Sequence, residues 1–199
     1  MNLDNAKLLY VISCFLLCLV ILSPTLFSFV SLPEGETFSE LWLLGPNHMI
    51  ESGAVNVLLN QPYTFHLGVS NHMNGVEYYS LFVKLRNQSQ AFQEMGNELP
   101  SSAKSVFAYR FFLNRNETWE NNFLFSFQEV SFEENISQVS LLSIGSYDVN
   151  LDEQLLRDET DDCFYCQLLF ELWLYNSTTS DFQFHNRAVG YWIRLSEQL

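Results

Sequence analysis

The stretch 77–87, EYYSLFVKLRN, decides the fold. Its side chains alternate between two faces, and this alternation is typical of a β-strand with one face in a hydrophobic core. The polar face carries Ser80, Lys84 and Arg86. The apolar face carries Tyr79, Leu81, Val83 and Leu85. We therefore predict a half-buried strand over 77–87.

Similar short apolar runs recur along the chain, separated by turn signals such as Gly45-Pro46-Asn47. They lie at 40–44, 55–59, 63–69, 106–113, 122–130, 139–144, 163–176 and 182–195. The run 106–113 fits a helix or a strand, and its aromatic and β-branched content favours the strand. Many short strands predict an all-β fold, an Ig-like β-sandwich of about eight or nine strands. The segments 94–104 and 151–162 are predicted to be long connections.

The N-terminal segment 8–30 contains no charged residue. About 20 apolar residues cross a bilayer as a helix, so the segment predicts an anchor that contacts the lipid bilayer. The alternative is a cleaved signal peptide, for which Ser23-Pro24-Thr25 is a weak cleavage site. Lys7 precedes the segment while Glu34 and Glu36 follow it, which favours a cytoplasmic N-terminus. We expect a single-pass membrane protein with an anchor at 1–31 and an extracytoplasmic domain at 32–199.

The formal net charge is −14, from 23 acidic and 9 basic residues. A surface this acidic repels phosphate backbones, so nucleic acid is excluded as a partner. Solubility explains the charge, and cation binding is the alternative. The acidic residues of the loop 158–162 offer oxygen ligands for calcium, although their spacing is not that of an EF-hand and a solvated loop is the better explanation.

Two His-Met pairs, each preceded by Asn, lie in predicted loops. They are His48-Met49 and His72-Met73. Imidazole and thioether ligands suit copper, so two loops at one end of a sandwich predict a candidate metal site. The alternative is that the methionines fill the edge of the core while the histidines form turn hydrogen bonds.

The pair Cys163 and Cys166 begins a predicted strand, where positions three residues apart point to opposite faces. Their Cα atoms would lie about 10 Å apart, too far for a disulfide. A zinc site needs a second pair of ligands, which the sequence lacks. We therefore expect no cofactor.

Four sequons predict N-glycosylation in an external compartment. They begin at Asn87, Asn116, Asn135 and Asn176, near predicted strand ends or loops. Asparagine and serine favour turns in any case, so the placement alone is weak support.

No GxSxG, HExxH or P-loop motif is present, and no catalytic residue is singled out. The many carboxylates leave a glycosidase-type pair open. The four tryptophans would suit a sugar-stacking platform, but Trp42, Trp173 and Trp192 lie in predicted strands and are assigned to the core. Trp119 lies in a turn-like setting.

The strings SELWLLGPNHM (39–49), VSNHMNGVEYYSLFVKLRNQSQ (69–90), QLLFELWLYN (167–176) and FQFHNRAVGYW (182–192) resemble the archaeal membrane-protein family catalogued as domain of unknown function 1616. The resemblance runs over essentially the whole part after the anchor. It implies an archaeal membrane protein with an extracytoplasmic β-rich domain, and it brings no catalytic residues. His48 and His72 fall within the shared strings.

These patterns predict a non-enzymatic cell-surface interaction module whose partner is an envelope protein or glycan. The alternative is an envelope metal-binding protein that uses His48, Met49, His72 and Met73 for copper, or the 158–162 loop for calcium. A glycan hydrolase is the weaker alternative.

Overall fold

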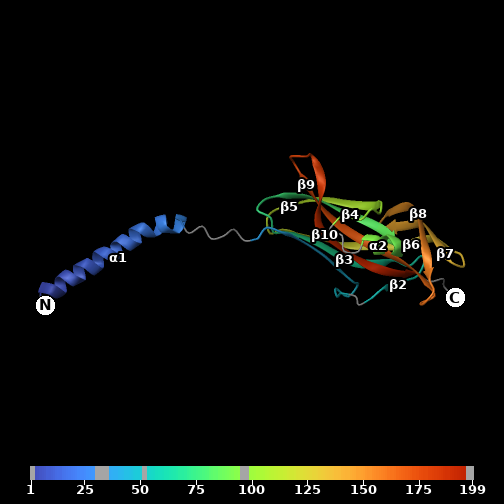
Figure 1. The fold of residues 1–199 in the computed structure, drawn as a ribbon, viewed down its shortest axis with the longest axis horizontal. Helices are drawn as coiled ribbons and strands as arrows, with labels where there is room; N and C mark the ends of the chain where they lie inside the picture. The colour runs from blue at the N-terminus through green and yellow to red at the C-terminus, as the bar shows by residue number, and fades with distance from the viewer. Residues whose placement is uncertain (1–2, 30–35, 51–52, 95–98, 196–199) are drawn as a thin grey trace. The chain divides into compact units, whose positions relative to one another are not determined.

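The computed structural model describes residues 3–29, 36–50, 53–94 and 99–195 (Figure 1). It divides into two units, Met1–Glu36 and Thr37–Leu199. The predicted domain boundary between residues 31 and 32 lies outside the described residues, as do residues 95–98 of the predicted connection 94–104.

The first unit contains helix α1, Leu3–Phe29, which covers most of the predicted anchor segment 8–30. Over the residues that the structure describes, no helix combines the length and the apolarity that a membrane crossing requires.

Over its described residues, the second unit contains ten strands and one short helix, α2 (Gln88–Glu94). The strands are β1 (Ser39–Leu44), β2 (Val55–Val57), β3 (Tyr63–Asn71), β4 (Glu77–Asn87), β5 (Ser105–Leu113), β6 (Thr118–Phe132), β7 (Ile136–Ile144), β8 (Tyr147–Asp158), β9 (Cys163–Asn176) and β10 (Asp181–Leu195). The predicted all-β class is confirmed, and the run 106–113 is a strand.

Strand β8 is the strand that the sequence analysis missed. The predicted loop 151–162 is wrong over most of its length, because Tyr147–Asp158 is a strand paired with β7. Its inward positions are Val149, Leu151, Glu153 and Leu155. A carboxylate among these apolar side chains, and the exposed Leu156 on the other face, hide the alternation.

The strands form one curled sheet in the order β1-β3-β6-β7-β8-β9-β10-β2, and β4 pairs with both β9 and β5. All pairings are antiparallel except that of β10 with β2. One half of the sheet contains β1, β3, β6, β7 and β8, and the other contains β5, β4, β9, β10 and β2. The ladder joins the halves at the register pairs Arg157–Phe164 and Asp158–Cys163.

The core lies between these two halves, which pack face to face. The ring of Phe123 on β6 meets Phe170 on β9 edge-on at 4.9 Å, and Phe65 on β3 lies 5.0 Å from Tyr191 on β10. The apolar face predicted for 77–87 is confirmed, since its four side chains are at most 1% exposed. They are Tyr79, Leu81, Val83 and Leu85.

The opposite face of β4 is not open to solvent throughout, so the half-buried strand predicted there is only partly right. Ser80 and Lys84 are buried. Helix α2 packs on β4 and β9, and the chain after it crosses this outer face through Ser101. This cover sets the position of the candidate site.

A candidate binding groove

A groove of about 770 Å³ lies on the outer face of β4, β9 and β10. Helix α2 contributes Gln88 and Ala91 to its lining, and the segment leading into β2 contributes Ala54. A concave, mostly apolar site with a few placed polar groups is the usual form of a ligand site.

One row of side chains crosses the floor of the groove. Arg86 on β4 is in register with Gln167 on β9, and Gln167 is in register with Trp192 on β10. All three line the groove. Adjacent strands are about 4.8 Å apart, so a guanidinium, an amide and an indole follow one another at that spacing.

The amide of Gln167 has a fixed orientation. Nε of Arg86 donates a hydrogen bond of 2.7 Å to Oε1 of Gln167, so Oε1 faces Arg86. The other end, Nε2, lies on the Gly190 side, 3.4 Å from where a Cβ on Gly190 would stand. Nε2 has no hydrogen-bond partner among the described residues, and it is therefore a donor available to the groove.

Gly190 keeps part of the floor free of side chains. It is in register with Leu169, beside the row formed by Arg86, Gln167 and Trp192. A Cβ at this position would lie 2.6 Å from the carbonyl oxygen of Leu168, well inside a van der Waals contact. The close approach of β10 to β9 thus requires glycine and leaves space next to Trp192.

The α2 wall starts at a capping box. Oδ1 of Asn87 accepts a 3.0 Å bond from the backbone N–H of Gln90, and Oε1 of Gln90 accepts a 3.2 Å bond from the N–H of Asn87. This reciprocal pair satisfies two backbone donors at the helix start. The motif is visible in the sequence as NQSQ (87–90), where only a glycosylation sequon was predicted.

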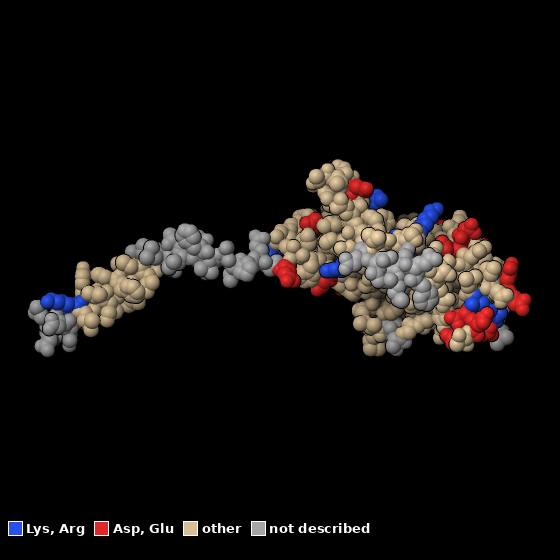
Figure 2. Space-filling view, in the orientation of Figure 1, with Lys and Arg blue, Asp and Glu red and all other residues tan. Residues whose placement is uncertain are grey.

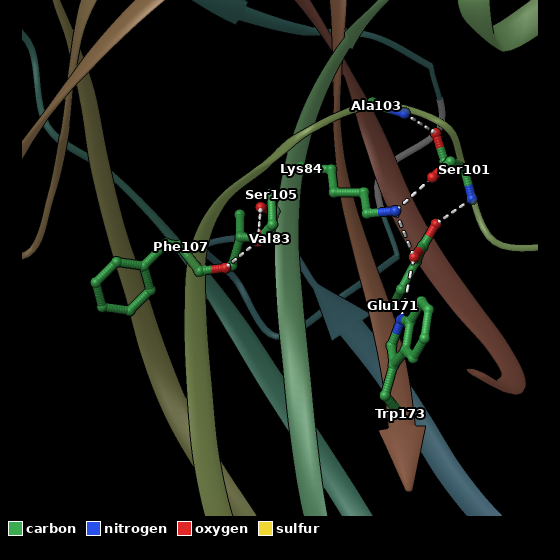
Figure 3. Close-up of polar contacts among 8 residues, drawn as sticks. All are labelled: Val83, Lys84, Ser101, Ala103, Ser105, Phe107, Glu171 and Trp173. Carbon is green, nitrogen blue, oxygen red and sulfur yellow. Dashed lines mark hydrogen bonds and ion pairs between the residues drawn. The ribbon is translucent and has the colours of Figure 1, made fainter. Parts of the chain in front are cut away.

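A buried ion pair fixes the chain that follows α2 (Figure 3). Nζ of Lys84 lies 2.8 Å from Oε2 of Glu171, and it donates a 2.5 Å bond to the carbonyl of Ser101. Oε1 of Glu171 accepts a 2.6 Å bond from the Ser101 N–H, and Oε2 accepts a 3.2 Å bond from Nε1 of Trp173. We call Lys84, Glu171 and Ser101 the clamp. It holds the segment around Ser101 against the sheet.

The four side chains predicted as copper ligands do not come together. Leu44 pairs with His66 while Ser39 pairs with Asn71, so His48, after β1, and His72, after β3, lie at opposite ends of the β1–β3 pair. The ring of His48 stacks on His66 at 3.5 Å.

The contacts of His72 and the exposure of the two methionines also give no sign of a shared metal site. Nε2 of His72 lies 3.5 Å from Oε2 of Glu40. Met49 is 63% exposed, so the alternative that it fills the core edge is wrong; Met73 is half-buried. In the described residues no group of three or more His, Cys, Asp or Glu is placed to hold a metal ion.

The carboxylates of the predicted calcium loop interact with their own chain. Oδ1 of Asp158 accepts the N–H of Thr160 at 2.9 Å, and this bond lowers the pKa of Asp158. Arg157 pairs with Asp162 at 2.5 Å, and the Tyr165 hydroxyl donates to Asp161 at 2.5 Å. On the face shown in Figure 2, acidic side chains gather at the end of the β unit where β7 and β8 lie.

Cys163 and Cys166 lie at the start of β9, as the sequence predicts, and both are buried free thiols. Burial raises the pKa of the Cys166 thiol far above its ordinary value. A thiol that resists ionisation is a poor nucleophile and a poor metal ligand.

Two of the four sequon asparagines are exposed in turns, and the side chains of the other two form hydrogen bonds within the protein. Asn116 and Asn135 are exposed in the turns before β6 and β7. Asn87 caps α2, and Nδ2 of Asn176 donates to Gln183 at 3.0 Å.

The tryptophan assignments are partly wrong. Trp192 lies on the outer face in the groove, because its neighbours Tyr191 and Ile193 point into the core. Trp119, expected in a turn, is the second residue of β6, and its ring stacks on Phe111 with the centroids 4.3 Å apart. If side chains alternate strictly along 191–193, buried Tyr191 and Ile193 require an outward Trp192, so its predicted place in the core is wrong.

No family model and no curated protein matches this chain. Among solved structures, the CARDB domain of the PF1109 protein from Pyrococcus furiosus, in complex with di-metal ions, is similar over 80% of this chain and 90% of its own, with 9% identity and a TM-score of 0.37. A mutant β-glucosidase from Listeria innocua in complex with laminaribiose is similar over 81% of this chain and 16% of its own, with 8% identity and a TM-score of 0.35. At these scores neither likeness bears on function, and the resemblance to domain of unknown function 1616 stays a prediction.

Proposed function

We propose that this protein is a non-enzymatic interaction module of the cell envelope, an Ig-like β-sandwich that binds its partner in the groove on β4, β9 and β10. The observation that carries the proposal is the row Arg86–Gln167–Trp192 on the groove floor. Residues from three strands place a guanidinium, an oriented amide and an indole side by side in one lining. Rigid strands position such groups more accurately than loops do.

The chemistry of the lining supports recognition over catalysis. Among the lining residues that the structure describes, none is Asp, Glu, His or Cys. Acid–base and nucleophilic mechanisms depend mostly on these side chains. Aromatic and amide groups, by contrast, supply contact area and directed hydrogen bonds.

The proposed address rests on the sequence. The uncharged segment 8–30, with Lys7 before it, supports a single-pass anchor and an extracytoplasmic domain. The partner is then a component of the envelope, either a protein or a glycan. The acidic net charge argues against nucleic acid.

Site-specific photo-crosslinking in cells tests the proposal. A benzophenone amino acid replaces Ala54, which lines the groove, and in a matched strain it replaces Tyr147, which is 62% exposed and outside the lining residues. We expect a discrete adduct from position 54 that position 147 does not give. The adduct should disappear when Trp192→Ala is added, and it should remain in the membrane fraction after an alkaline wash.

Identical patterns from the two positions would show that the groove engages nothing and would overturn the binding proposal. Recovery of the protein in the soluble fraction would overturn the anchor while leaving the groove intact.

A further inference from the structure

Resting on the proposed function, we infer that the groove binds a saccharide of one to three rings, with one ring stacked on Trp192 and a hydroxyl oxygen bound by Nε2 of Gln167. The inference names the ligand class of the groove and depends on four features of its lining.

The first feature is the aromatic platform. Trp192 is half-buried on the outer face, and its neighbours Tyr191 and Ile193 are fixed in the core. Gly190, two residues earlier on the same face, has no side chain to cover the space beside the indole. The π face is the negative part of an aromatic ring. It therefore attracts the C–H groups on the apolar face of a pyranose.

The second feature is the oriented donor next to the platform. Because Arg86 binds Oε1 of Gln167, the amide presents Nε2 to the groove, where it has no partner among the described residues. An amide N–H₂ donates to hydroxyl, ring and carboxylate oxygens. Gln167 and Trp192 are register partners on adjacent strands, about 4.8 Å apart, so both can contact a single sugar ring, the indole at its face and the amide at its edge.

The third feature is charge. The chain carries a net charge of −14, yet the described lining residues include one cation, Arg86, and no carboxylate. The described part of the lining thus lacks the acidic groups that dominate the chain as a whole. Such a lining suits neutral molecules rich in oxygen.

The fourth feature separates a saccharide from an extended peptide. The floor is the face of a sheet whose central strand β9 is paired with β10 on one side and β4 on the other. The backbone groups of β9 are used by these neighbours, so a peptide cannot add there as a further strand. Side chains alone recognise the ligand, and about 770 Å³ is within the size range of sites for small organic molecules.

The test is binding of a defined panel to the full-length protein in detergent, measured by isothermal titration calorimetry and ligand-observed NMR. The panel contains neutral and uronic-acid mono-, di- and trisaccharides, with linear polyols as non-ring controls. We expect at least one saccharide to bind and the polyols not to bind. The preferred arm of the panel would show whether the ligand is neutral or acidic, and in either case the indole and the amide should carry the recognition.

Two variants examine the groups that carry the inference. Trp192→Ala removes the platform, and Gln167→Glu keeps the acceptor for Arg86 while replacing the Nε2 donor with an oxygen. Each should weaken binding at least tenfold. The matched controls are Phe112→Ala, an exposed aromatic outside the lining, and Gln183→Glu on β10, whose Oε1 accepts from Asn176. Neither control should change affinity.

The two levels of the proposal fail differently. If no saccharide binds but the adduct at position 54 still depends on Trp192, the saccharide inference is overturned and the interaction module stands. If neither saccharide nor adduct is found, both are overturned. Saccharide binding that survives both Trp192→Ala and Gln167→Glu would place the ligand elsewhere and overturn the inference.

Discussion

Nζ of Lys84 and Oε2 of Glu171 lie 2.8 Å apart, with side chains that are 7% and 1% exposed. The two residues come from neighbouring strands, but their burial comes from the segment around Ser101, which covers them. A buried pair is worth little relative to an apolar pair of equal volume, whereas the loss of one partner leaves an uncompensated charge. The clamp therefore makes the position of the segment around Ser101 depend on two side chains.

Lys84→Met should destabilise the protein by about 3–5 kcal/mol, because the Glu171 carboxylate remains buried without its cation. The double variant Lys84→Met/Glu171→Gln should recover a large part of this loss, since no charge remains and the amide oxygen still accepts from Ser101. Urea unfolding of the two variants and the wild type measures the difference. Equal stability of the single and double variants would contradict the assignment of the clamp as a coupled pair.

Glu153→Gln should stabilise the protein at neutral pH. Glu153 lies at an inward position of β8, and burial, with a further contribution from Asp152, raises the pKa of its carboxyl. The folded state thus favours the protonated form, so the wild type loses stability as the pH rises through the raised pKa.

The measurement for Glu153 is stability against pH. The advantage of Glu153→Gln should be present at pH 7 and should vanish as the pH falls below the ordinary carboxyl range of about 4. Asn150→Ser, at an exposed position of the same strand, involves no titratable group and is the control, and its stability difference from the wild type should show no such convergence. A constant difference at all pH values would mean that the carboxyl is not desolvated.

His185 should make the fold sensitive to mild acid. Burial is the main cause that lowers the pKa of its imidazole, and the charge of Arg187 is the second. Nε2 of His185 lies 3.1 Å from Oγ of Ser39. The unfolded chain takes up the proton first, at about pH 6.5, so stability falls as the pH drops through that value toward the lowered pKa. The wild type should therefore lose more stability between pH 7 and pH 5 than His185→Asn does. Parallel losses in thermal melts of the two proteins would refute this assignment.

Asn87 should behave as a helix cap rather than as a glycan acceptor. Asn87→Ala should cost about 1 kcal/mol, whereas Asn87→Asp, which also destroys the sequon, keeps an acceptor for the Gln90 N–H and should cost less. In a glycosylating host, Asn116→Gln and Asn135→Gln should each remove one glycan mass, and Asn87→Asp should remove none. A mass loss in Asn87→Asp would show that the cap opens to modification.

The strand 77–87 could be predicted from the sequence because its core face is continuously apolar from Tyr79 to Leu85. Strand β8 could not, because Glu153 interrupts its inward face. Burial of Lys84 depends on the segment around Ser101, which crosses the outer face of the sheet. No pattern within 77–87 could predict this cover.

The candidate groove depends on the register of three strands. Arg86, Gln167 and Trp192 meet only because β9 lies between β4 and β10, and strand order is not encoded in the alternation of any single strand. The outward direction of Trp192 could be predicted from Tyr191 and Ile193, but its neighbours could not. The predicted site residues His48 and His72 share a motif rather than a location, since the length of β1 separates them.

The passage of the ladder between the two halves at Arg157–Phe164 and Asp158–Cys163 has a mechanical consequence. A ligand in the groove pulls on β4, β9 and β10, while the chain from residue 37 enters the other half through β1. Tension between these points is carried across the two-pair seam, the aromatic contacts between the halves, and the hydrogen bonds that join Ser39 on β1 to His185 and Arg187 on β10. The contacts between the halves, in addition to the ladders within them, therefore resist separation of the groove from residue 37.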